Sequence, residues 1–187
     1  MSQLLFGYND VGIYYKRIAN WFAHGAFHTV DSDHLPFQFH FGPALALLAP
    51  VLALWPSVGA LIVAQSVGIV GTGLLLFGVV KWRGGSPAAA LALCLCYLLH
   101  PATSQQTYCY GFGFHPTSLA LPCLVMAWYW LDERRYWPGA IAALLALGWQ
   151  EHVPVYFIGM GSIWLLLRER RRLGLACIGV GTAYFLL

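Results

Sequence analysis

Side chains able to exchange protons or bind cations gather in a few polar stretches of this 187-residue chain. The first stretch holds Asp10 and the sequence Asp31-Ser32-Asp33-His34, and a later one holds Glu151 beside His152. Carboxylates and imidazoles are common general acids and bases. Asp31 and Asp33 also offer the hard oxygen ligands of a divalent cation, although a solvated turn has the same composition. The chain has seven histidines: His24, His28, His34, His40, His100, His115 and His152.

The histidines and cysteines do not have the spacing of an HExxH zinc site or of a redox motif. No HExxH pattern occurs among the histidines. The five cysteines show no CxxC spacing, and four of them lie inside apolar runs, as small buried apolar residues do. They are Cys94, Cys96, Cys109, Cys123 and Cys177. A divalent metal therefore stays a possible cofactor on Asp31 and Asp33 alone.

The elements that must position this chemistry are apolar helices. The chain is 59% hydrophobic and 9% charged, and its mean hydropathy is +0.66, whereas a soluble domain carries about 25% charged residues. This composition excludes a disordered, collagen-like or disulfide-stapled chain. The net charge of +3 comes from residues at helix ends, so it does not indicate a nucleic-acid-binding face. The composition predicts an all-α, polytopic membrane helix bundle.

Seven apolar runs follow residue 42 and are separated by Pro, Gly or charged residues. Only Val58–Val80 reaches the roughly 20 residues of a full membrane span. We interpret Pro43–Trp55, which Pro50 interrupts, as a juxtamembrane or re-entrant helix. Residues 1–57 then form an outer loop, and residues 58–187 form one bundle of about five to six spans. The runs are Pro43–Trp55, Val58–Val80, Ala88–His100, Thr117–Leu131, Gly139–Trp149, Val153–Leu167 and Leu173–Leu187.

Basic residues predict the orientation of these runs. Eight of the ten Lys and Arg lie in three alternate connections, namely Lys81, Arg83, Arg134, Arg135, Arg168, Arg170, Arg171 and Arg172. The positive-inside rule places those connections in the cytoplasm. Residues 1–57, 101–116 and 149–153 then face outward from the cell membrane, and all seven histidines lie on or beside that face. The acids Asp132, Glu133 and Glu169 are expected to be surface partners of the cytoplasmic arginines.

An interfacial helix is predicted after residue 10. Its apolar positions are spaced i, i+3, i+4 and i+7, and they are Val11, Tyr14, Tyr15, Ile18, Trp21 and Phe22. Lys16 and Arg17 fall off this stripe, and Asn9 or Asp10 can serve as the N-cap. In the long span, the small residues Ala60, Ala64, Gly68 and Thr72 recur every four positions, which predicts close helix packing.

Five motifs resemble one family of predicted prokaryotic membrane proteins, domain of unknown function 2079. They occur in register from about residue 8 to the C-terminus. The motifs are Asn9-Asp10-Val11-Gly12-Ile13-Tyr14, Trp21-Phe22-Ala23-His24-Gly25, His40-Phe41-Gly42-Pro43 with Leu47-Leu48-Ala49-Pro50, Gly113-Phe114-His115-Pro116, and Gln150-Glu151. The family is similar to the C-type glycosyltransferases, membrane enzymes that use polyprenyl-phosphate-linked sugars. The resemblance therefore implies membrane lipids and a polyprenyl-phosphate sugar donor as partners.

This resemblance implies roles for individual residues on the outer face. Asp10 matches the acidic residue that acts in catalysis in the first outer loop of those enzymes. There it would deprotonate the acceptor hydroxyl or hold the acceptor. The other expected catalytic residues are Glu151, His40 and His115; the expected substrate-binding residues are Lys16, Arg17, His34, His152 and Tyr110; and Asp31 and Asp33 are the expected metal ligands.

Each of these roles has a structural alternative. Asp10 and Glu151 could stabilise helix N-termini, and Lys16 and Arg17 could reach toward anionic headgroups rather than a donor phosphate. Tyr110, in the aromatic loop of residues 108–114, could stack on a sugar or lie in the headgroup belt.

Three departures from the family pattern favour a different function. Phe39, Thr117 and His152 stand where an acid is common in that family, so a non-catalytic membrane module or degenerate relative is the alternative to an enzyme. A transporter or metal-handling protein is a weaker third alternative. Because only residues 1–9 precede Asp10 and the chain ends in an apolar run, we expect part of a longer protein, or a shortened relative. If the site exists, Asp10, His40, His115 and Glu151 should converge.

Overall fold

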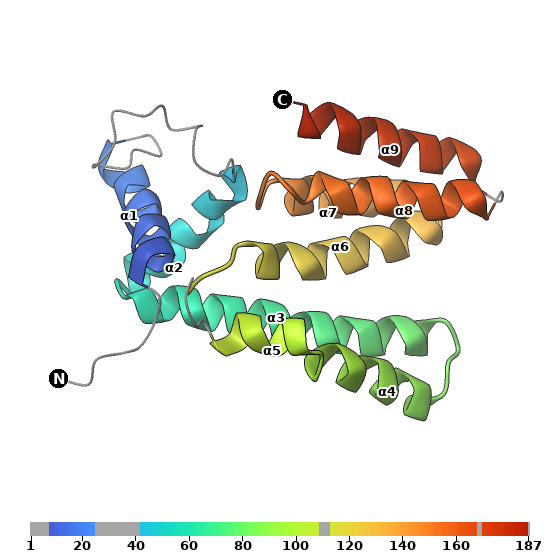
Figure 1. Ribbon diagram of the computed structural model, residues 1–187, viewed down its shortest axis with the longest axis horizontal. Coiled ribbons are helices and arrows are strands. Elements are labelled where there is room, and N and C mark those ends of the chain that lie inside the picture. Colours follow the sequence, from blue (N-terminus) through green and yellow to red (C-terminus); the bar gives the residue numbers. More distant parts are fainter. Residues whose placement is uncertain (1–7, 25–41, 109–112, 168–169, 187) are drawn as a thin grey trace.

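A computed structural model describes residues 8–24, 42–108, 113–167 and 170–186 (Figure 1). Helices and their connections make up all of these residues, and the described ranges contain no strand, so the all-α prediction is confirmed. The elements are α1 (Tyr8–His24), the 3-10 helix η1 (Pro43–Leu48), α2 (Ala49–Leu54), α3 (Val58–Trp82), α4 (Pro87–Leu98), α5 (Pro101–Tyr108), α6 (Thr117–Asp132), α7 (Tyr136–Leu147), α8 (Pro154–Leu166) and α9 (Arg171–Phe185).

The helices form a bundle with two different ends. α3, α4, α6, α7, α8 and α9 run along the long axis, whereas α1 crosses one end of them (Figure 1). We call this the α1 end. At the opposite end lie the α3–α4, α6–α7 and α8–α9 connections (Figure 1), which carry most of the basic residues, and we call it the arginine end. The pairs α3·α4, α3·α6, α6·α7 and α8·α9 make the main packing contacts.

Most of the described apolar helices are shorter than a full membrane span. Within the described residues, only α3 is long and apolar enough to cross a membrane by itself. The apolar helices α4, α7 and α8 have 12, 12 and 13 residues, or about 18–20 Å at 1.5 Å per residue. The expectation of five to six spans is thus not confirmed by helix length.

The predicted interfacial and juxtamembrane segments are helical. α1 begins at Tyr8, so Asn9 and Asp10 lie in its first turn and not at the expected N-cap. The Pro43–Trp55 run forms two short helices, and Pro50 stands in the first turn of α2, where a missing N–H costs little. Trp55 ends α2, and Ser57 caps α3 by accepting a hydrogen bond from the Gly59 amide at 3.2 Å.

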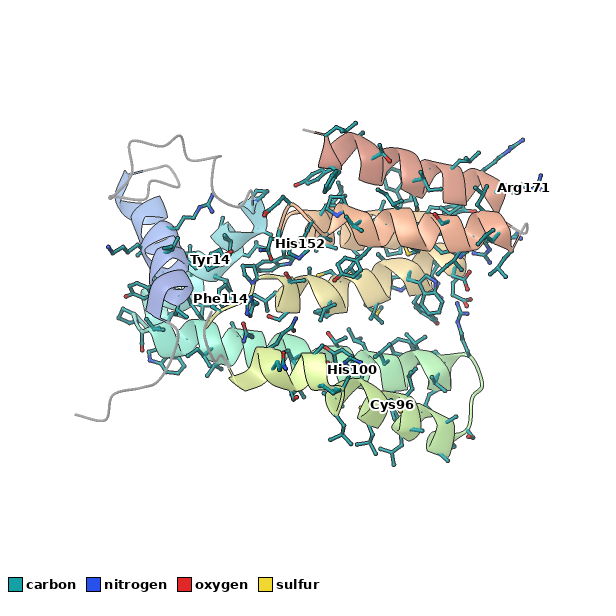
Figure 2. All side chains as sticks on the ribbon, in the orientation of Figure 1. Tyr14, Cys96, His100, Phe114, His152 and Arg171 are labelled. Atoms are coloured by element: carbon teal, nitrogen blue, oxygen red, sulfur yellow. The ribbon has the colours of Figure 1, made fainter. Side chains whose placement is uncertain are left out.

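One connection predicted as an outer loop is partly a helix. Residues 101–108 form α5, which packs on α3 and α4. His100 therefore lies between the two ends of the bundle and not at the α1 end with His152, contrary to the expectation that all the histidines share one face (Figure 2). The physical reason is that α4 is too short to reach the α1 end, so α5 must continue the path.

The acids at the arginine end pair with arginines, as predicted for Asp132 and Glu133. Asp132 is bonded to Arg83, and its other carboxylate oxygen lies 3.3 Å from Arg170. Glu133 lies 3.5 Å from Arg83, and the Trp164 indole N–H donates to Asp132 at 3.2 Å. Asp132 thus ties all three connections of this end together. Glu169 lies outside the described residues.

Small residues allow the helices to approach closely. A Cβ at Gly68, a member of the predicted stripe, would lie 2.6 Å from the Ser118 carbonyl oxygen of α6. In α8, a Cβ at Gly161 would lie 2.5 Å from the Gly174 carbonyl oxygen of α9. Real side-chain carbons do not approach that closely, so these backbones are in direct contact.

We predict that Gly161→Ala destabilises the chain because the added methyl group must push α8 and α9 apart. Overpacking of this kind costs about 1–3 kcal/mol, which lowers the melting temperature in detergent by about 2–10 °C. Gly159→Ala, on the same helix with nothing within 4 Å of the added carbon, is the matched control and should be neutral. Equal melting temperatures of the two variants would contradict the close packing.

Candidate functional site

Gln65 organises the backbone at the α1 end. It is an amide within the apolar helix α3, and it is 1% exposed. Its Nε2 donates to the Gln106 carbonyl at 2.7 Å and to the Gly113 carbonyl at 3.5 Å. Its Oε1 accepts from the backbone N–H of His115 at 2.5 Å. One side chain thereby holds the chain on both sides of residues 109–112.

A second polar group joins α6 to the α7–α8 turn. The Thr117 hydroxyl donates to Gln150 Oε1 at 2.5 Å and lies 3.0 Å from His152 Nε2. Because this hydroxyl gives its proton to Gln150, the His152 ring nitrogen is the donor in the other bond. Thr117 and Gln150 are buried, whereas His152 is exposed. The segments that carry His115 and Glu151 therefore lie side by side.

α1 and η1 close over these segments. The Tyr14 and Phe114 rings pack edge to face, with centroids 5.5 Å apart (Figure 2). The Ala44 amide donates to the Gly148 carbonyl at 2.7 Å. A Cβ at Gly42 would lie 2.6 Å from the Trp149 carbonyl oxygen, so this position requires glycine. The start of η1 is thus fixed against the end of α7, one turn from Glu151.

Arg17 is buried at this end, contrary to its predicted position off the apolar stripe. It is 4% exposed, whereas its neighbour Lys16 is exposed. Arg17 follows the buried Tyr14 by three residues, and residues at i and i+3 share a helix face. The stripe is wider than the apolar residues alone indicate because α1 packs against η1, α2 and α3 together.

Glu151 supplies a negative charge near Arg17. Burial lowers the pKa of Arg17 from its ordinary value, and the charges of Tyr14 and Glu151 act in the opposite direction. Tyr184, near the end of α9, is also within electrostatic range of Glu151. Glu151, which is half-buried in the turn before α8, thus lies within electrostatic range of side chains on both α1 and α9.

The remaining predicted site residues divide into two groups. His115 is half-buried just before α6, and its carbonyl accepts a 2.7 Å hydrogen bond from the Ser118 hydroxyl. The Asp10 side chain and the residues Asp31, Asp33, His34, His40 and Tyr110 lie outside the described part of the chain. The convergence of Asp10, His40, His115 and Glu151 thus stays a prediction. Among the described residues, no group of three His, Cys, Asp or Glu could hold a metal ion.

Sequence reasoning missed Gln65 and Gln150 as organising residues. A signal was present for Gln65, because a polar side chain inside an apolar span is costly and indicates a specific partner. Its partners are carbonyls and an amide of the backbone, and the identity of a backbone group does not depend on residue type. No residue pattern could therefore have named them.

We predict that the charges of Arg17 and Glu151 are energetically coupled. Arg17→Gln should destabilise the chain by about 0.5–3 kcal/mol because it removes the buried positive charge near the half-buried Glu151. Thermal unfolding of Arg17→Gln, Glu151→Gln and the double variant should give a coupling energy of about 0.5–3 kcal/mol. Lys16→Gln, one residue away and exposed, is the control and should be near neutral. Strictly additive losses would rule out the coupling.

The comparisons with known proteins identify a family. No curated protein and no solved structure matches the chain. One family model, described as "Predicted membrane protein (DUF2079)", matches residues 2–187. It covers both the α1 end and the arginine end, and it agrees with the resemblance carried by the five motifs. The chain belongs to this DUF2079 family of predicted membrane proteins.

Proposed function

We propose that the chain crosses the membrane several times and that α1 lies on the membrane surface. The outward-facing sides of the bundle helices support this arrangement, because large apolar side chains are exposed along them, among them Val67 and Leu74 of α3, Leu144 of α7 and Ile163 of α8. Soluble monomers rarely expose so many. α4 and α5 together provide residues 87–108, and the other short helices cross with polar or aromatic flanks.

The proposed topology places the arginine end in the cytoplasm and the α1 end outside. The positive-inside rule supports it, since the three basic connections share one end. The direction of α1 supports its place on the membrane surface, because an amphipathic helix that crosses the ends of the spans lies in the plane of the interface.

Cysteine labelling tests this topology. Single cysteines at Ser32 and Ser86, in a variant whose five native cysteines are replaced by alanine, should react differently with a membrane-impermeant maleimide in intact cells. We expect labelling at Ser32, in the segment after α1, and protection of Ser86, at the start of α4, until the membrane is opened. Labelling of Ser86 with protection of Ser32 would reverse the topology.

We further propose that the α1 end transfers a sugar from a polyprenyl-phosphate-linked donor. The observation that carries this proposal is the buried cation Arg17, which lies within electrostatic range of Glu151 and, in the proposed topology, at the level of a lipid phosphate. Guanidinium groups form strong charge-assisted bonds with phosphate. Arg17 and Lys16 would bind the donor phosphate, and Asp10 would accept the proton of the acceptor hydroxyl, as the resemblance implies. Glu151 would orient Arg17.

One observation favours the alternative of a non-catalytic membrane module. Thr117 and His152, which stand where the family pattern often has acids, are hydrogen-bonded to each other at 3.0 Å. In this arrangement a hydroxyl and an imidazole replace two carboxylates. It joins α6 to the α7–α8 turn, which is a structural role and needs no substrate.

A transfer assay with a matched binding assay distinguishes the two functions. The full chain in nanodiscs is given a radiolabelled decaprenyl-phosphate-linked sugar together with a membrane extract that supplies acceptor hydroxyls. Release of decaprenyl phosphate as the sugar passes to an acceptor measures consumption of the donor, and binding of decaprenyl phosphate is measured in parallel. For an enzyme, Asp10→Asn should reduce donor consumption about 10²–10⁴-fold, the usual contribution of a general base, and leave binding unchanged. Arg17→Lys, which keeps the charge but loses the paired donors, should weaken binding. Binding without consumption by the wild-type chain would favour the non-catalytic module.

A further inference from the structure

The arginine end carries more positive charge than its own acids can balance. Its described residues include seven basic side chains, and their acidic counterparts are Asp132 and Glu133. Arg83 and Arg170 make the ion pairs with these two acids. Four more arginines, Arg134, Arg135, Arg171 and Arg172, are exposed, and so is Lys81.

These arginines are brought together by the contacts of Asp132. Arg134 and Arg135 follow Asp132 by two and three residues in the α6–α7 turn. Arg171 and Arg172 directly follow Arg170, which lies 3.3 Å from Asp132 and donates to the Leu131 carbonyl at 3.0 Å. Two arginine pairs that are far apart in sequence therefore adjoin one ion-pair cluster, and Arg171 points away from the bundle (Figure 2).

Exposed indoles flank the same end. Trp82, the last residue of α3, is 55% exposed and packs its ring on Tyr129 at a centroid distance of 5.3 Å. Trp137, in the first turn of α7, is 83% exposed. Indole rings prefer the boundary between the hydrocarbon and headgroup layers of a membrane. In the proposed membrane arrangement, these indoles would place the neighbouring arginines at the depth of lipid phosphates.

From this arrangement, we infer that the arginine end is a binding surface for anionic phospholipid headgroups, held by Arg134, Arg135, Arg171 and Arg172. Charge complementarity selects an anionic lipid over a zwitterionic one. The exposed indoles select a lipid headgroup over a soluble polyanion, because they need an apolar layer beside the phosphates. This surface is separate from the proposed transfer site at the α1 end and does not depend on it.

Binding to vesicles of defined composition tests the inference. The full chain in neutral detergent is immobilised. Two kinds of vesicle are passed over it, one of phosphatidylcholine alone and one in which about a third of the lipid is anionic phosphatidylglycerol. Each basic residue near an anionic surface is expected to change the affinity about fivefold. The variant R134Q/R135Q/R171Q/R172Q should therefore bind phosphatidylglycerol vesicles at least about a hundredfold more weakly, and the binding of the wild-type chain should fall as salt is raised.

The charge-preserving variant R134K/R135K/R171K/R172K is the matched control. It should retain most of the binding because the attraction depends on charge at the headgroup level. The four side chains are exposed, so both variants should show the circular dichroism and melting temperature of the wild type. Equal binding of the wild-type chain to vesicles with and without phosphatidylglycerol would overturn the inference. Undiminished binding by the glutamine variant, or loss of binding by the lysine variant, would overturn it too.

Discussion

Helices surrounded by apolar material must satisfy their backbone hydrogen bonds internally, and the rest of this structure follows from that requirement. Polar side chains that need other partners are confined to positions where helices end or where a second segment supplies them. Gln65 illustrates the second case, since its amide group bonds to the backbone at Gln106, Gly113 and His115. In this way the backbone at residue 106 and at residues 113–115 is held against α3.

The two ends of the bundle meet this requirement by different means. At the arginine end, ion pairs converge on Asp132, whose side chain is 22% exposed. Partly solvated pairs of this kind add little stability individually, and their effect is to hold three connections in register. At the α1 end the groups are more buried, as with Thr117, Gln150 and Arg17. Buried charges and hydrogen bonds are costly to lose, so this end is where substitutions should matter most.

The functional proposal rests on this difference between the ends. A buried arginine with a nearby carboxylate is expensive to maintain, and such groups are usually kept for binding or chemistry. The Thr117–His152 hydrogen bond at the same end indicates that structural needs also contribute. Family membership is established over residues 2–187 and adds the description of a membrane protein.

The sequence by itself determined the helical class, the apolar runs, the helix after residue 10 and the pairing of Asp132 and Glu133 with arginines. These features follow from local composition and from a periodicity that one helix face expresses. Tertiary structure alone decided that Arg17 is buried, that α5 extends α4, and that Gln65 and Gln150 organise the α1 end. The burial of Arg17 depends on how many neighbours α1 has, and the partners of Gln65 are backbone groups that every residue possesses. Residue type and spacing encode neither the burial of Arg17 nor the partners of Gln65, because both arise when distant segments meet.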